Sequence, residues 1–103
     1  MSRFARAMAR ANRVMATALA DGLATYRRAN GETIESVSYT LERDALVYDD
    51  PASGIGRITT IVEIPVSAVP DSGQGDVIET PEGRWYYVHI VTDDGDFRRI
   101  EVN

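Results

Sequence analysis

Cysteine is absent from this 103-residue chain, and histidine and tryptophan each occur once. The lack of cysteine excludes disulfides, thiolate nucleophiles and cysteine-ligated metal sites. A single histidine, His89, excludes a metal site with two histidine ligands from one chain. No apolar run approaches the roughly 20 residues that a membrane-spanning helix needs, and the alanine-rich start lacks the apolar core of a signal peptide. We therefore expect a soluble, cytoplasmic protein with no cofactor, no metal and no contact with a membrane.

Lysine is also absent, so all eleven basic residues are arginines, set against sixteen acidic residues. The charge is divided along the chain. Residues 1–28 hold six arginines and one acid, whereas residues 29–103 hold five arginines and fifteen acids. A uniform globular surface would not be expected to segregate charge in this way. We predict one structural domain overall, with a basic helical arm at residues 1–30 attached to an acidic antiparallel β body at residues 31–103.

The arm has two stripes of side chains at helical spacing. Large and small apolar residues recur every three or four positions from Phe4 to Leu23, and a second stripe consists of Arg3, Arg6, Arg10 and Arg13. This spacing predicts an amphipathic helix over residues 3–28. Two interpretations stay open: a helix packed on the body with a solvated arginine face, or an arm whose arginines dock on an acidic partner. Nucleic-acid binding is disfavoured, because no aromatic residues lie between the arginines and the body is acidic.

The most apolar stretch of the body is residues 84–92, RWYYVHIVT. Apolar side chains fall on both faces of this extended segment, which favours a central strand covered on both sides. We expect its core residues to be Trp85, Tyr87, Val88 and Ile90. Glycine-bearing turns flank it, so the sequence predicts an antiparallel meander of residues 76–80, 84–92 and 97–102.

Three segments before the meander also have strand character, at residues 33–41, 45–48 and 57–64. The segment at residues 66–69 lies between two prolines, so we expect it to pair only as an edge or bulged strand. Residues 49–56 and 71–75 are rich in Asp, Ser and Gly and indicate loops. The predicted fold class is mainly β with an N-terminal helix, built as a small antiparallel barrel or sandwich of five or six short strands.

Residue patterns that indicate catalysis are scarce. His89 lies within a strand, where a hydrogen-bonded or partly exposed histidine is more typical than a general base. The acidic cluster at residues 93–96 lacks the EF-hand spacing and indicates a turn. Arg98 and Arg99, on the last strand, are expected to protect an exposed sheet edge. We predict that the chain is not an enzyme.

The segment GDVIETPEGRWYYVHIVTDDGDFRRIEV, residues 75–102, resembles the closing part of a known family. The matching positions are Gly75-Asp76, Pro81-Glu82-Gly83, Tyr86/Tyr87-Val88 and Arg98 to Val102. Together with the chain length and the layout of a short helix before a β body, they resemble small head–tail joining proteins of long-tailed phages. These are proteins of the head-completion or stopper type, similar to the head–tail joining protein of phage lambda.

The resemblance implies a structural component of the virion neck, made in the cytoplasm of the bacterial host. It implies a homo-oligomeric ring, a hexamer or dodecamer, that joins the portal or adaptor to the tail and helps to retain packaged DNA. DNA would pass through the lumen without specific binding. Within this reading we predict that partners contact Arg3, Arg6, Arg10, Arg13, Asp49, Asp50 and Ile55. Two alternatives remain: a small β interaction or regulatory module with a docking helix, and a small-molecule-binding or enzymatic β-barrel that uses His89.

Overall fold

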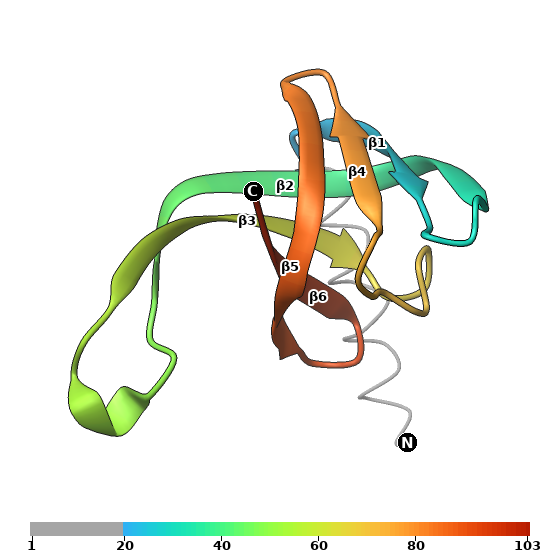
Figure 1. Cartoon of the computed structure of the whole chain (residues 1–103). Helices are drawn as coiled ribbons and strands as arrows, with labels where there is room; N and C mark the ends of the chain where they lie inside the picture. The colour runs from blue at the N-terminus through green and yellow to red at the C-terminus, as the bar shows by residue number, and fades with distance from the viewer. Residues whose placement is uncertain (1–19) are drawn as a thin grey trace, which may run out of the picture.

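The computed structural model describes residues 20–103, which form a closed antiparallel barrel (Figure 1). The strands are β1 (Gly22–Arg27), β2 (Thr33–Val47), β3 (Arg57–Pro65), β4 (Val77–Thr80), β5 (Gly83–Asp93) and β6 (Phe97–Val102). Around the barrel their order is β1-β2-β3-β6-β5-β4. The predicted mainly-β class and the meander of β4, β5 and β6 are confirmed.

The first strand, β1, lies where the sequence predicted the end of a helix. Ala24 and Tyr26 are buried, whereas Leu23 and Arg27 are exposed, which is the alternation of a strand. This strand pairs with β2 on one side and β4 on the other, and these non-local hydrogen bonds override the helical spacing. The helix prediction is therefore wrong for residues 22–27, and the β body includes them. Of the rest of the predicted helix, residues 20, 21 and 28 are not helical, and residues 3–19 lie outside the described residues.

The barrel interior holds one main apolar cluster. Its fully buried members include Tyr26, Val37, Tyr39, Val62, Ile64, Val69, Ile78, Ile100 and Val102. The two buried tyrosines keep their hydroxyl groups paired, because Tyr26 donates to Asp76 (2.6 Å) and Tyr39 donates to Glu82 (2.5 Å). Burial, followed by the hydrogen bond to Glu82, raises the pKa of Tyr39 to about 12. Both rings therefore fill the core without leaving a polar group unpaired.

The strand expected to be central, β5, pairs on both sides but is not covered on both faces. None of its residues is fully buried. Trp85 and Tyr87 pack against the core from its margin, Val88 is partly buried, and Ile90 is 39% exposed. The prediction of Ile90 as a core residue is wrong, and Trp85, Tyr87 and Val88 are peripheral rather than central. The reason is that the sheet closes into a barrel, so only one face of each strand points into the core. Two register shifts in β5 change which of its side chains point inward.

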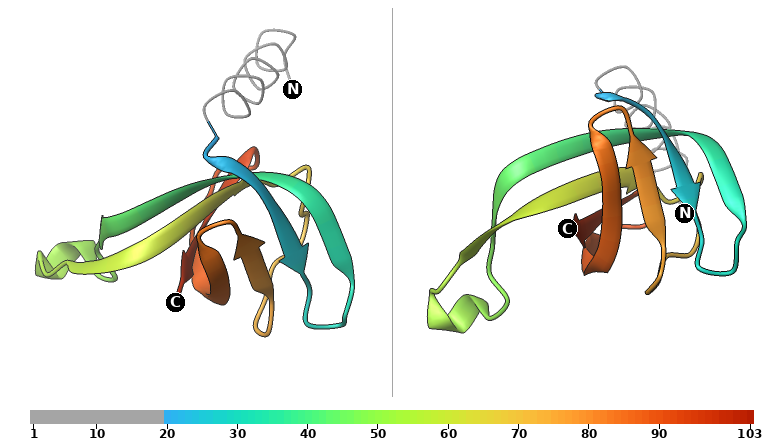
Figure 2. Two further views of the ribbon diagram at one scale, coloured as in Figure 1. Left: turned by 90° about the horizontal axis from the view of Figure 1, so that it is seen from above. Right: turned by 45° about the horizontal axis from the view of Figure 1, so that its top comes forward.

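The second strand, β2, is one continuous strand where the sequence predicted separate strands at residues 33–41 and 45–48. A bulge between Glu42 and Ala45, with Asp44 in the left-handed region (φ 59°), joins the two halves. Beyond it, β2 and β3 leave the barrel together as a hairpin closed by a short 3-10 turn, Pro51–Ser53 (Figure 2). The predicted loop at residues 49–56 is confirmed as the end of this hairpin.

The chain between β3 and β4 is held by Arg98. Residues 66–69 form a turn and not the predicted edge strand, and Val69 is fully buried. The Arg98 guanidinium, almost fully buried, donates to the carbonyl oxygens of Val69 (2.9 Å) and Pro70 (2.8 Å) and to the Ser72 hydroxyl (2.9 Å). Because β6 lies between β3 and β5, the edge-protecting role predicted for Arg98 and Arg99 is wrong.

We predict that the same substitution on β3 destabilises the protein more in the barrel core than on the projecting hairpin. Ile64 is fully buried on β3, whereas Ile58, on the same strand, is 62% exposed. We expect Ile64→Ala to lower the free energy of unfolding by about 2–5 kcal/mol and Ile58→Ala to change it by less than about 0.5 kcal/mol. Urea unfolding of both variants measures the difference, and equal losses would show that the boundary of the core is misplaced.

Candidate interaction surface

The hairpin extends beyond the strands that close the barrel. Strand β3 pairs with β6 only from Thr60 to Pro65, and β2 pairs with β1 only as far as Tyr39. Past these points β2 and β3 pair only with each other in the described part of the chain. We call residues 45–58 the overhang. A two-stranded ribbon has one face that the barrel does not cover, which makes its side chains available for contact.

Large apolar side chains occupy that uncovered face. Leu46 lies opposite Ile58, and the two are 56% and 62% exposed. Tyr48 is also exposed, and a Cβ on Gly56 would lie 2.6 Å from Leu46 and 3.1 Å from Tyr48, so both side chains lie over this glycine. We call Leu46, Tyr48 and Ile58 the overhang apolar face. Ile55, at the tip of the hairpin, is 76% exposed.

This face is an extension of the barrel core. Side chains two residues apart share one face of a strand, so Ile58 follows the buried Val62 and Ile64 along β3. If the barrel were one layer longer, Leu46 and Ile58 would be core residues. Contiguous exposed apolar side chains of this kind mark interaction sites.

The opposite face of the overhang is attached to the barrel. Ala45, Val47 and Ile61 form a second buried cluster, and Val91 of β5 packs against it. This contact orients the hairpin relative to β5 and leaves the overhang apolar face turned to solvent. The hairpin therefore has one attached face and one free face.

Hydrogen-bonded charges reinforce the attachment. The Arg57 guanidinium donates to both carboxylate oxygens of Glu101 (2.5 and 2.6 Å) and to both of Asp49 (2.7 and 2.9 Å). Glu101 is buried and also accepts from the Thr59 hydroxyl (3.1 Å). His89 Nε2 lies 2.9 Å from Glu101, and the His89 side chain is about half exposed. The expectation of a partly exposed histidine is confirmed. Hydrogen bonding from Arg57 holds the pKa of Glu101 below its usual value.

The structure separates the partner-binding residues that the sequence predicted. The Asp49 carboxylate accepts hydrogen bonds from Arg57. Asp50 accepts a hydrogen bond from the backbone N–H of Ala52 (3.1 Å), which caps the 3-10 turn. Ile55 is free to contact a partner. The four arginines of the arm lie outside the described residues. Sequence reasoning missed the overhang apolar face, although the apolar alternation of the two strands was visible.

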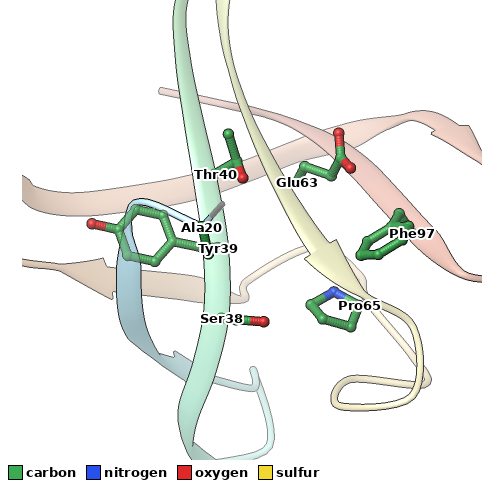
Figure 3. A pocket seen from close by; sticks show the side chains of 7 residues that line it. All are labelled: Ala20, Ser38, Tyr39, Thr40, Glu63, Pro65 and Phe97. Atoms are coloured by element: carbon green, nitrogen blue, oxygen red, sulfur yellow. The ribbon is translucent and has the colours of Figure 1, made fainter. Parts of the chain in front are cut away.

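Two hollows on the surface do not include His89. One, on the outside of β2 and β3, lies among Thr40, Glu63 and Phe97 (Figure 3) and has a volume of about 10 Å³, about the space of one water molecule. The other is a broad depression of about 260 Å³ beside Asp76.

In residues 20–103, no group of three or more His, Cys, Asp or Glu side chains is placed to hold a metal ion. Over the same residues, no helix is long and apolar enough to cross a membrane.

The Arg57–Glu101 pair predicts a pH dependence of stability. A carboxylate with a lowered pKa contributes stability that is fully present above its usual pKa of 4.5 and is lost as the pH falls through its lowered folded-state pKa. We expect Glu101→Gln to lower the free energy of unfolding near pH 7 by about 1.5–3 kcal/mol, as for a hydrogen bond to a charged group. The variant should then lose less additional stability than the wild type on acidification to about pH 3.

Urea unfolding at both pH values measures these differences. Glu35→Gln, at an exposed position on β2, is the matched control and should change stability by less than about 0.5 kcal/mol. Wild-type stability of Glu101→Gln at neutral pH would contradict a role for Glu101 in holding the hairpin.

One family model matches almost the whole chain. The model of the Phage Head-Tail Attachment protein covers residues 1–102. No curated protein matches the chain closely enough to count as a relative. A match of this extent includes the whole barrel and the overhang. The chain therefore belongs to the phage head–tail attachment protein family.

Proposed function

We propose that this chain is a structural subunit of the phage neck, forming a homo-oligomeric ring that joins the portal or adaptor of the head to the tail. Family membership supplies the head–tail role. The observation that carries the proposal is the overhang apolar face, which extends the core of one subunit beyond its own barrel. A subunit built in this way needs a protein partner to cover Leu46, Tyr48 and Ile58.

The energetic argument follows from the area that assembly would cover. Full burial of one Leu, Ile or aromatic side chain contributes about 1.5–3 kcal/mol. Three such side chains, already half exposed on a pre-formed hairpin, contribute several kcal/mol to an interface. The attachment of the other face by Arg57 and the second cluster keeps the ordering cost of binding low.

Charge supports a passage for DNA through the ring without specific binding. Residues 29–103 carry fifteen acids against five arginines. An acidic wall releases few counterions from DNA and offers little phosphate neutralisation. In this proposal the ring, a hexamer or dodecamer, lines the neck of the virion and helps to retain the packaged genome. The subunits are made in the host cytoplasm before assembly.

The proposal includes no catalytic step. His89 Nε2 lies beside Glu101, which Arg57 already holds in two hydrogen bonds. In this proposal Glu101 holds Arg57 and the hairpin and does not act with His89 in a reaction. The arm contributes separately: Arg3, Arg6, Arg10 and Arg13 dock on an acidic surface of a ring neighbour or another neck protein.

The overhang apolar face is tested by three substitutions made together, Leu46→Ser, Tyr48→Ser and Ile58→Thr. Because all three positions are exposed, the variant should fold with nearly unchanged stability and yet fail to join heads to tails. Complementation of a phage that lacks this protein, read by electron microscopy and infectious titre, measures joining. The control Leu46→Met, Tyr48→Phe and Ile58→Val keeps the face apolar and should join normally. Normal joining by the polar variant would refute the proposal.

The arm is tested by replacing Arg3, Arg6, Arg10 and Arg13 with Gln. Exposed ion pairs contribute only about 0–1 kcal/mol each, so the four substitutions are made together. We expect unchanged thermal unfolding but a loss of assembly that is deepest at high salt, where the remaining charge contacts are screened. Assembly equal to the wild type at every salt concentration would show that the arginine stripe is only a solvated surface.

A further inference from the structure

A second apolar surface lies on the outside of β1, β4 and β5. The registers place Thr25 beside Glu79 and Glu79 beside Arg84 across the three strands. The outward-facing positions of these strands form one continuous surface, which we call the β1–β4–β5 outer face. Its members are Leu23, Thr25, Arg27, Val77, Glu79, Arg84 and Tyr86.

This surface combines exposed apolar area with positive charge. Leu23 is 59% and Tyr86 is 49% exposed. Arg27 pairs with Glu79, and Arg84 lies 3.9 Å from the same carboxylate with its side chain 61% exposed. Two arginines therefore share one glutamate, on a body in which acids outnumber arginines.

The overhang has the opposite charge. Asp49 and Asp50 are exposed on it, and Arg57 is its single basic residue, while Arg43 and Asp44, both exposed, lie beside it. Asp49 and Glu101 already take up the charge of Arg57. The overhang thus presents apolar side chains with a surplus of negative charge.

The two surfaces lie on opposite sides of the subunit. In every view the hairpin projects from one side of the barrel, and β1 and β4 lie on the other (Figures 1 and 2). Opposite placement prevents the overhang from covering the β1–β4–β5 outer face of its own chain. A second copy can bring the two surfaces together.

We propose that the overhang apolar face of one subunit docks on the β1–β4–β5 outer face of a second copy, with Asp50 directed toward Arg84. The inference rests on the proposed ring and names its interface. Contact between two overhangs would place like charges together. Contact between an overhang and a β1–β4–β5 outer face instead pairs opposite charges and covers apolar side chains on both subunits. Such a contact is head-to-tail, and head-to-tail contacts generate a ring when the rotation between subunits closes.

The absence of cysteine from the natural sequence makes cross-linking a direct test. A double variant, Ile58→Cys with Tyr86→Cys, places one thiol on each surface. Tail-bearing particles assembled with this variant are treated with a short bis-maleimide and analysed under denaturing conditions. We expect a ladder of covalent multimers. Each single variant should stay monomeric, because a head-to-tail contact never brings two identical positions together.

A matched control, Ser67→Cys with Tyr86→Cys, keeps the outer-face thiol and moves its partner to an exposed turn. It should give no ladder. Leu46→Cys with Leu23→Cys tests the same interface through independent positions and replaces the first pair if that variant fails to assemble. Dimers from Ile58→Cys alone would show overhang meeting overhang and overturn the inference.

The outcomes also separate this inference from the proposed function. Tail-bearing particles that contain both double variants but yield no more multimers than the control would overturn the interface and leave the neck role standing. Absence of the wild-type protein from the necks of tailed particles would overturn the neck role itself.

Discussion

Unequal strand length is the constraint from which the rest of this structure follows. Strands β2 and β3 have 15 and 9 residues, whereas β1 and β6, the strands that pair with their other edges, have 6 each; β5 has 11 residues and β4 only 4. A barrel can be no longer than the strands that close it, so the surplus of β2 and β3 must leave it as a hairpin. The inward face of the barrel then continues into solvent. Leu46 and Ile58 are exposed for this reason and not because the local sequence is unusual.

A free two-stranded ribbon is at best marginally stable in water, so the overhang needs support from the barrel. Val91 packs against its attached face, and Arg57 links Asp49 at the hairpin to Glu101 on β6. The bulge at Asp44 makes this geometry possible, because it shifts the register of β2 where the strand leaves the barrel. The hairpin is thereby held in one orientation, which suits a contact repeated identically around the proposed ring.

Local patterns in the sequence were sufficient for much of the fold. A run of β-branched residues predicted β3, and apolar runs separated by glycine-bearing turns predicted the meander of β4, β5 and β6, whose paired strands are close in sequence. The strand β1 was mistaken for helix, since its Ala-rich context has helical spacing and only pairing with β2 and β4 makes it a strand. Ile90 was assigned to the core because apolar side chains on both faces of a segment do not reveal whether both faces are covered.

The interaction surface was harder to predict for the same physical reason. Ile55 lies in a predicted loop, where exposure can be inferred locally, and it is 76% exposed; its contact with a partner stays a prediction. Leu46 and Ile58 look like ordinary core residues of two strands, and their exposure depends on where the distant β1 and β6 stop pairing. The exposure of this surface depends on strand pairings that are distant in sequence, so it cannot be predicted from local patterns in a single sequence.

The central claim is that assembly covers the part of the core face that the barrel leaves open. Electron cryomicroscopy of the intact neck, at a resolution that shows side chains, tests it most directly. The account predicts that Leu46, Tyr48 and Ile58 are buried against another protein subunit in the assembled particle. A neck in which these three side chains remain exposed to solvent or to the DNA channel would contradict it.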